Sequence, residues 1–386
     1  MLRDLYDADH EAFRDSVAKF IEKDIAPHRE RWDEVGLIDR DAWSAAGEAG
    51  FLGIAVPEEF GGGGTEDFRF RTVLMEEFAR AGANSFNAGT SVQDDLVIPY
   101  LVDLGTPSQK KRWLPRLCDG SAIGALALTE PAAGSDLQGV RTQADRDGTD
   151  WILRGSKVFI TNGILADVVI VFARTDPQKG SRGFSLFVVP TDTPGFRRGR
   201  KLNKLGLRGN DTAELFFDDL RLPAEALLGT EGRGFAHLME RLPRERMSIA
   251  ATSLTASQAA FAWTTAYCFE RKAFNSVVGD FQATRFTLAE ISTELDAATA
   301  LFDRAVLALN AGTLSAVDAA KAKYWISEVH QRVVDRCLQL HGGYGYMLEY
   351  PIARAYADAR IQPIYGGTNE VMKEIIGREI AEQSRR

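Results

Sequence analysis

Two short segments of the chain combine glycine with hydroxyl and carboxyl side chains, and they lie more than two hundred residues apart. The first is Leu128–Asp136, with the sequence Leu-Thr-Glu-Pro-Ala-Ala-Gly-Ser-Asp, and the second is Tyr365–Glu370, with the sequence Tyr-Gly-Gly-Thr-Asn-Glu. Glycine-rich turns present backbone N–H groups that bind phosphates and the polar edge of a ring. A third segment, Phe159–Thr161, adds an aromatic face and a hydroxyl. Together the three segments offer a flat face and N–H donors that suit a ring carrying phosphates, whereas each segment alone is equally compatible with an ordinary turn or with a core position on a strand.

Glu245 is the carboxylate whose surroundings are most suggestive of acid–base chemistry. It lies in the run Arg-Leu-Pro-Arg-Glu-Arg-Met, residues 241–247, where the pattern is helical. Pro243 removes one backbone hydrogen bond and kinks a helix, which can turn Glu245 inward. The competing interpretation is a solvated helix face, because Glu245 stands between Arg244 and Arg246 and charge runs usually face water.

The predicted secondary structure that positions these segments changes twice along the 386 residues, from helices to strands and back to helices. Helical spacing of apolar residues begins near residue 8, with helices expected near 66–81 and 108–117. Short β-branched and aromatic runs follow, at 122–128, 157–161, 168–173, 184–189 and 213–217. The helical period then returns from residue 233 to the end. We therefore expect an α+β multidomain chain with an all-α domain at 1–121, a β-barrel or β-sheet domain at 122–232 and a helical bundle at 233–386.

The three segments, together with Glu270–Phe274 (Glu-Arg-Lys-Ala-Phe), resemble the acyl-CoA dehydrogenase family, in order along nearly the whole chain. The resemblance implies the three-domain fold of that family, with a four-helix bundle as its last domain. It also implies an FAD-dependent conversion of an acyl-CoA thioester to the trans-2-enoyl-CoA. An electron-transfer flavoprotein is the implied electron acceptor, and a homotetramer is the implied assembly.

The same resemblance assigns cofactor contacts residue by residue. From the β domain it implies that FAD is contacted by Leu128, Thr129, Gly134, Ser135, Phe159, Ile160 and Thr161. From the helical bundle it implies Arg271, Phe274, Gln282, Gln339, Gly342 and Gly343, which reach the FAD of a neighbouring subunit, and also Thr368 and Glu370. Two departures from the family pattern are Phe159, where many relatives carry Trp, and the pair Asn275–Ser276, where Gly-Lys is common.

The family pattern also bears on the catalytic base, because many members carry a catalytic glutamate where this chain has Gly366. The branch that includes long-chain and isovaleryl acyl-CoA dehydrogenases carries its base on the first helix of the last domain, which corresponds here to Glu245. The resemblance then implies that Glu245 removes the α proton while the backbone N–H of Gly366 polarises the thioester carbonyl. Substrate contacts are expected from Ser135, Arg244, Arg246, Gly366 and Gly367, with Arg246 holding its helix to the C-terminal loop.

Composition narrows the remaining possibilities. Lys+Arg 46 against Asp+Glu 54 gives a net charge of −8, which disfavours nucleic acid and anionic membranes as partners. Three widely spaced cysteines and the lack of a signal or membrane-spanning segment favour a reduced, cytoplasmic protein. No histidine pair with metal spacing and no Rossmann glycine motif is present, so neither a metal nor nicotinamide is expected.

Two other functions stay open at this point. A flavin monooxygenase or oxidase on the same fold would need no base at the α carbon. A catalytically inactive acyl-CoA-binding scaffold is suggested only by Gly366. Acyl chain length and branching cannot be read from the sequence.

Overall fold

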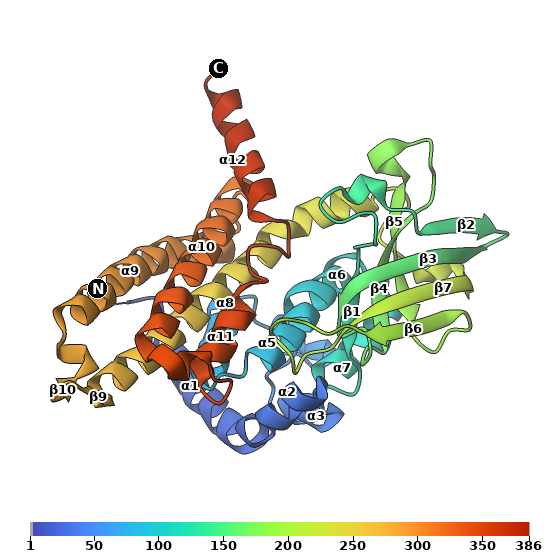
Figure 1. Ribbon diagram of the computed structural model, residues 1–386. Coiled ribbons are helices and arrows are strands. Elements are labelled where there is room, and N and C mark those ends of the chain that lie inside the picture. Colours follow the sequence, from blue (N-terminus) through green and yellow to red (C-terminus); the bar gives the residue numbers. More distant parts are fainter. Residues whose placement is uncertain (1–2, 386) are drawn as a thin grey trace.

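The computed structural model describes residues 3–385, and its elements follow the predicted order of helices, strands and helices (Figure 1). Two helices of the N-terminal part, Ala8–Phe20 and Pro107–Cys118, begin after residues suited to cap them. Asp7 and Thr106 each accept a hydrogen bond from the backbone of the first helical turn and form a capping box. The helices of this part are α1 (Ala8–Phe20), α2 (Arg29–Val35), α3 (Arg40–Glu48), α4 (Phe68–Arg80), α5 (Asn84–Ser91), α6 (Ile98–Leu104) and α7 (Pro107–Cys118). A π-helical turn, Val92–Val97, joins α5 to α6.

The middle part forms one sheet of eight strands, in the order β6-β7-β3-β2-β4-β5-β8, with β1 paired in parallel to β4. The strands are β1 (Gly124–Ala127), β2 (Gln143–Asp147), β3 (Asp150–Thr161), β4 (Val168–Arg174), β5 (Phe184–Pro190), β6 (Phe196–Lys201), β7 (Thr212–Leu222) and β8 (Leu227–Leu228). The β-branched and aromatic pattern misses β2 and β6, because most of their residues are charged or polar and lie at the surface.

The last part consists of α8 (Gly234–Glu270), a small hairpin of β9 (Lys272–Ala273) and β10 (Ser276–Val277), and then α9 (Gln282–Asn310), α10 (Ala316–His341), α11 (Pro351–Ala359) and α12 (Asn369–Gln383). Helices α8, α9 and α10 pack side by side, and α11 packs on α8 and α10. Helix α12 contacts α10 near its beginning and then projects away from the molecule (Figure 1). No helix within residues 3–385 has the length and apolar character needed to cross a membrane.

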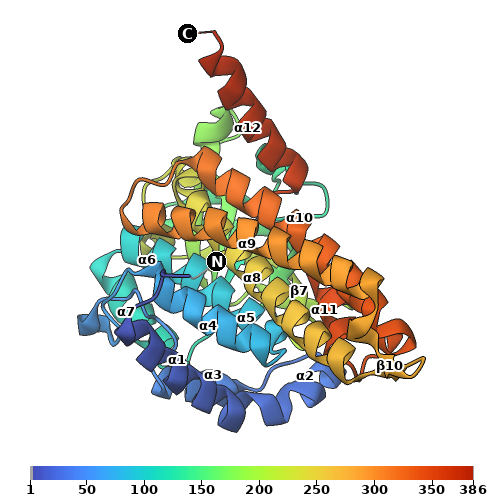
Figure 2. The same cartoon turned by 90° about the vertical axis from the view of Figure 1, so that its left-hand side faces the viewer.

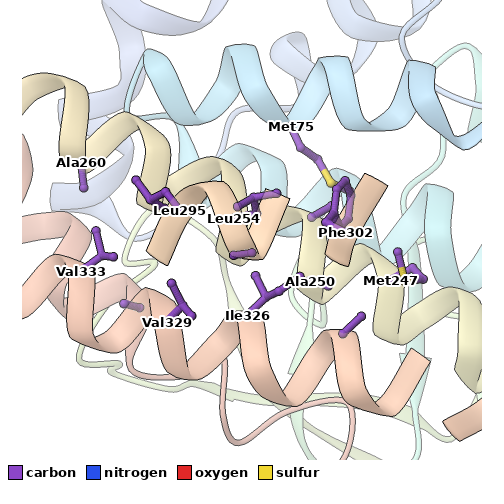
Figure 3. Packing of buried hydrophobic residues seen from close by; sticks show 14 of the residues in the cluster. Met75, Met247, Ala250, Leu254, Ala260, Leu295, Phe302, Ile326, Val329 and Val333 are labelled. Atoms are coloured by element: carbon purple, nitrogen blue, oxygen red, sulfur yellow. The ribbon is translucent and has the colours of Figure 1, made fainter. Parts of the chain in front are cut away.

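The core of the bundle extends into the N-terminal helices. Met75 of α4 packs against the apolar faces of α8, α9 and α10, which contribute Leu254, Phe302 and Ile326 among others (Figure 3). Figure 2 shows α4 lying along α8. This burial fixes α8 between the N-terminal helices and α10, so the residues on its remaining face are held against the sheet.

Candidate active site

A cavity of about 310 Å³ lies where α8, the sheet and the loop before α12 meet. Its wall includes Glu245 of α8, Gly366 of the loop, and Phe159 and Thr161 at the end of β3. The structure therefore brings together candidate residues from segments that are far apart in the sequence. The cavity is where a flat ring and a thioester would have to meet.

Glu245 is buried, with 5% of its surface exposed, and it faces this cavity. The interpretation of Glu245 as a solvated helix position is therefore wrong. The hydroxyl of Tyr100 donates a hydrogen bond of 3.0 Å to its Oε1 atom. Burial raises the pKa of Glu245 to about 7, although the Tyr100 bond and the charges of Arg246 and Arg241 oppose the rise. A carboxylate with this pKa accepts a proton readily near neutral pH.

Gly366 lies against Glu245's own helix. Its φ of 63° is in the left-handed region, and a Cβ atom at this position would overlap Cδ1 of Ile249, one helical turn after Glu245. Among residues 3–385, the N–H of Gly366 meets no hydrogen-bond acceptor. It is therefore free to donate to a ligand in the cavity.

Lys323 of α10 anchors this loop, which spans residues 360–368. Its buried ammonium donates to the carbonyl of Gly367 (2.8 Å) and to the side chain of Asn369 (3.0 Å), which also contacts Ser327. Burial, with the nearby charge of Arg246, lowers the pKa of Lys323 to about 8. Thr368 caps α12 by accepting from the N–H of Val371, and Glu370 is exposed in the first turn of that helix. Neither Thr368 nor Glu370 lines the cavity.

The end of β3 turns Phe159 into the cavity. The pairing of β3 with β7 shifts register between Lys157 and Ile160, and Phe159 within this bulge has a φ of 61° and is 66% exposed. Bulges of this kind re-aim a side chain next to a functional site. The side chain of Ile160 is buried in the core of the sheet, so the predicted contact of this residue with a cofactor would be made by its main chain.

The turn after β1 is tied to the same strand. Lys157, which is fully buried, donates to the carbonyl of Leu128 and to the carboxylate of Glu130, and Glu130 accepts from the N–H groups of Arg141 and Thr142. The carbonyl of Thr129 accepts from the N–H of Val158. The glutamate of the Thr-Glu-Pro segment thus holds the turn in place. Gly134 and Ser135 are exposed beyond it, and a Cβ atom on Gly134 would meet only open space.

These features fit FAD. The exposed aromatic side chain of Phe159 at a bulge suits a flat ring, and the open turn at Gly134 suits a phosphate-bearing tail. Phe159, Thr161, Thr129 and Gly134 are the residues that would hold it on the sheet side. When bound, FAD supplies the acceptor for a hydride.

The expected substrate residues Arg244 and Arg246 are placed differently from one another. Arg246 is buried as predicted, but its hydrogen bond goes to the carbonyl of Ala316 at the start of α10. Within residues 3–385 this hydrogen bond of Arg246 does not reach the C-terminal loop, which Lys323 ties to α10. Arg244 is half-buried above the ring of Phe68.

The remaining predicted cofactor residues gather elsewhere. Tyr267, near the end of α8, stacks on His341 at the end of α10, and the guanidinium of Arg271 lies over the ring of Tyr344. Around this contact lie exposed residues that do not line the cavity, namely Arg271, Phe274, Gln282, Gln339, Gly342 and Gly343. Figure 1 shows β9 and β10 at the end of the bundle remote from the large sheet. Within one chain, the predicted FAD residues around Arg271 therefore lie apart from those that line the cavity, such as Phe159 and Thr161.

Sequence reasoning missed three residues of the site. Tyr100 bonds Glu245 across 145 positions, Lys323 anchors the loop, and Ile249 touches the space beside Gly366. A lysine at an inward position of an otherwise apolar helical stripe was a signal that could have identified Lys323. Nothing in the local sequence distinguishes Tyr100 or Ile249 from other core residues.

Three family models cover most of the chain: acyl-CoA dehydrogenase, N-terminal domain, at residues 7–121; middle domain, at 125–220; and C-terminal domain, at 232–381. The chain is 49% identical over 381 residues to the mitochondrial long-chain specific acyl-CoA dehydrogenase of Sus scrofa, covering 98% of this chain and 88% of that protein.

Two solved structures are also similar. An acyl-CoA dehydrogenase from Geobacillus kaustophilus has a TM-score of 0.95 and 45% identity, and the match covers 98% of this chain and 100% of the other. A glutaryl-CoA dehydrogenase from Mycobacterium smegmatis in complex with FADH2 has a TM-score of 0.91 and 33% identity, over 97% and 95% of the two chains.

Proposed function

Because this chain belongs to the acyl-CoA dehydrogenase family, we propose that Glu245 is its catalytic base and that the N–H of Gly366 is its carbonyl donor. The enzyme is an FAD-dependent acyl-CoA dehydrogenase, which forms the trans-2-enoyl-CoA and passes electrons to an electron-transfer flavoprotein. The observation that carries the assignment is that Glu245 and Gly366 face one cavity, together with Phe159 and Thr161.

Two residues of this chain take part in removing the α proton: Gly366 stabilises the thioester carbonyl and Glu245 accepts the proton. The free N–H of Gly366 donates to the thioester carbonyl, which stabilises the negative charge that develops on the oxygen and acidifies the α proton. Glu245 takes that proton and becomes a neutral carboxylic acid, while the β hydrogen leaves as hydride. A pKa near 7 suits this step because the base is largely ionised at mildly alkaline pH and still basic enough to take the proton.

Glu245→Gln tests the assignment because it keeps the shape of the side chain and removes its basicity. The variant should retain FAD and bind acyl-CoA, while anaerobic bleaching of the flavin slows by roughly 10²- to 10⁴-fold. Reduction at the wild-type rate would show that another group is the base. Bleaching of the wild type by a saturated acyl-CoA also separates a dehydrogenase from an inactive scaffold. Slow return of the flavin colour when oxygen is admitted separates a dehydrogenase from an oxygen-activating enzyme.

We also propose that the FAD site is shared between subunits of a homotetramer. The support is the exposed position of the second predicted set, including Arg271, at a place remote from the cavity, and the exposed apolar side chains of Phe274 (92%), Tyr346 (82%) and Ile380 (62%). Such side chains favour burial against another subunit. Arg271→Ala should lower FAD content. A flavin-replete monomer in light scattering would contradict the sharing.

Three assignments complete the proposal. The domains are taken as 1–121, 122–232 and 233–386, supported by the start of β1 at Gly124 and of α8 at Gly234. Arg244 and Ser135 are proposed as contacts of the CoA moiety. A cytoplasmic location is proposed because Cys118, Cys268 and Cys337 are all free thiols.

A further inference from the structure

The cavity that contains Glu245 has a second polar region, lined by His330 of α10, Asn84 of α5 and Gln362 after α11. His330 is 1% exposed, and neither of its ring nitrogens has a hydrogen-bond partner within residues 3–385. The Oδ1 atom of Asn84 is likewise buried and unpaired within that range. Buried polar groups are nearly always hydrogen-bonded. Unpaired atoms at a cavity wall therefore point to a ligand that supplies the missing partners.

This polar region is remote from Glu245. The N-terminal helices run antiparallel to α8, because Tyr100 bonds Glu245 whereas Asn87 bonds Thr252, seven residues further along α8. Asn84 lies one turn beyond Asn87, further from Glu245. On α10, Lys323 contacts the loop of Gly366, and His330 follows seven residues later, roughly 10 Å along the helix axis at 1.5 Å per residue.

Apolar residues make up much of the wall between the two regions, namely Ala88, Val92 and Leu96 on one side and Ile249 of α8 on the other. The hydroxyls that also line it, those of Ser91, Ser248 and Thr252, are already hydrogen-bonded within the protein. A chain that passes from Glu245 to His330 therefore meets hydrocarbon in its middle and polar atoms at its far part. A fully saturated chain of this length would leave the polar atoms of His330 and Asn84 without partners, at a cost of about 1–3 kcal/mol for each unsatisfied group.

The chemistry of the polar region favours a hydroxyl. Burial lowers the pKa of His330 to about 3, so the ring is neutral and offers one N–H donor and one nitrogen acceptor. A hydroxyl donates and accepts at once, which matches this pair. The cation in the described cavity wall is Lys204, which donates to the carbonyl of Asn210 and lies near Asp211 and Asp358, so a carboxylate in the cavity would have to compete with these two carboxyl groups for its charge.

We propose that His330, Asn84 and Gln362 form a subsite for a hydroxyl group on the distal part of the acyl chain, and that the enzyme favours such hydroxyacyl-CoA thioesters over saturated ones of equal length. The proposal rests on the function proposed above and deepens it. It makes His330 a specificity-determining residue that takes no part in the removal of the α proton.

The test measures anaerobic flavin reduction of the holoenzyme by three series of acyl-CoAs of equal chain length: saturated, hydroxylated at successive distal positions, and ω-carboxylated. The best hydroxyacyl-CoA should show kcat/KM about tenfold or more above its saturated counterpart, as one buried hydrogen bond would give. Equal or lower values for every hydroxyl position would overturn the proposal, as would a preference for the ω-carboxyl series. Failure of the saturated series as well would instead reject the dehydrogenase assignment.

Variants locate the effect. His330→Leu should abolish the hydroxyl preference, measured as the ratio of kcat/KM for the hydroxyacyl-CoA to kcat/KM for the saturated acyl-CoA of equal length. His237→Leu, which removes another buried histidine that does not line the cavity, should keep the preference. If His330→Leu does not fold, His330→Met serves in its place and should also abolish the preference, because a thioether donates no hydrogen bond. A preference that persists in the variant that folds would assign the hydroxyl to other residues and overturn the subsite.

Discussion

Tyr100→Phe should move the pH dependence of catalysis without abolishing it. The hydroxyl of Tyr100, fully buried, donates to the carboxylate of Glu245 at 3.0 Å, and this bond stabilises the ionised form. Its loss must therefore raise the pKa of Glu245 further above the value of about 7 that burial gives it. Hydrogen bonds to charged groups contribute about 1.5–3 kcal/mol. At 1.36 kcal/mol per pKa unit, this corresponds to a shift of about one to two units.

The assay is anaerobic flavin reduction at low acyl-CoA concentration, where the pH profile reports the free enzyme. The wild type should lose activity below pH 7, as Glu245 becomes protonated. In Tyr100→Phe, this acid limb of the pH–activity profile should lie about one to two pH units higher. The variant should approach the wild-type rate only at alkaline pH. This predicts a deficit at pH 7 that disappears on titration with base.

Tyr6→Phe is a matched control, because Tyr6 also donates a hydrogen bond to a buried glutamate, Glu76, at a site that does not line the cavity. Its acid limb should coincide with that of the wild type. An unshifted limb in Tyr100→Phe, or a shift to lower pH, would refute the role assigned to the Tyr100–Glu245 bond. An equal shift of the acid limb in Tyr6→Phe would show that the shift does not come from the Tyr100–Glu245 hydrogen bond.

Three further predictions concern the same site. Moving the base, as in Glu245→Gly with Gly366→Glu, should reduce the flavin more slowly than the same pair of substitutions with Ile249→Val added, because a Cβ at 366 overlaps Cδ1 of Ile249 and valine lacks that atom. No gain from Ile249→Val would refute the steric argument. Lys323→Met should lower the free energy of unfolding of the holoenzyme by about 1–3 kcal/mol in thermal unfolding, because it removes the hydrogen-bond donor to Gly367 and Asn369. Lys373→Met, at an exposed ion pair, is the control and should change the free energy of unfolding by less than about 0.5 kcal/mol. Equal effects of the two substitutions would contradict the anchoring role of Lys323. The pKa of Glu245 in the folded state is raised from 4.5 to about 7, so the folded state binds this proton more tightly and the stability of the wild type falls as the pH rises between these values. Between pH 4 and pH 8, Glu245→Gln should therefore gain roughly 3 kcal/mol of stability relative to the wild type. A constant difference in stability across this range would refute the buried charge.

Local patterns in the sequence were enough to predict most elements. Apolar spacing of three and four residues marks α4, α7 and the bundle helices, and β-branched runs mark β4 and β5, because each pattern reflects one buried face of one element. The order of helices, strands and helices follows from the same local patterns, which depend on neighbours within a few positions. The loss of a base at Gly366 and the candidacy of Glu245 came instead from the resemblance to the acyl-CoA dehydrogenase family, because local residue identity left Glu245 equally compatible with a solvated helix face.

The tertiary structure decided the rest, because it depends on which distant faces meet. Glu245 between two arginines reads equally well as a surface position, and only the packing of α8 against the N-terminal helices buries it beside Tyr100 and raises its pKa. The bulge that exposes Phe159 arises from its pairing with β7, and the loop of Gly366 is held by Lys323 of another helix. Burial, register and hydrogen bonds across the fold are long-range quantities, and no local pattern contains them.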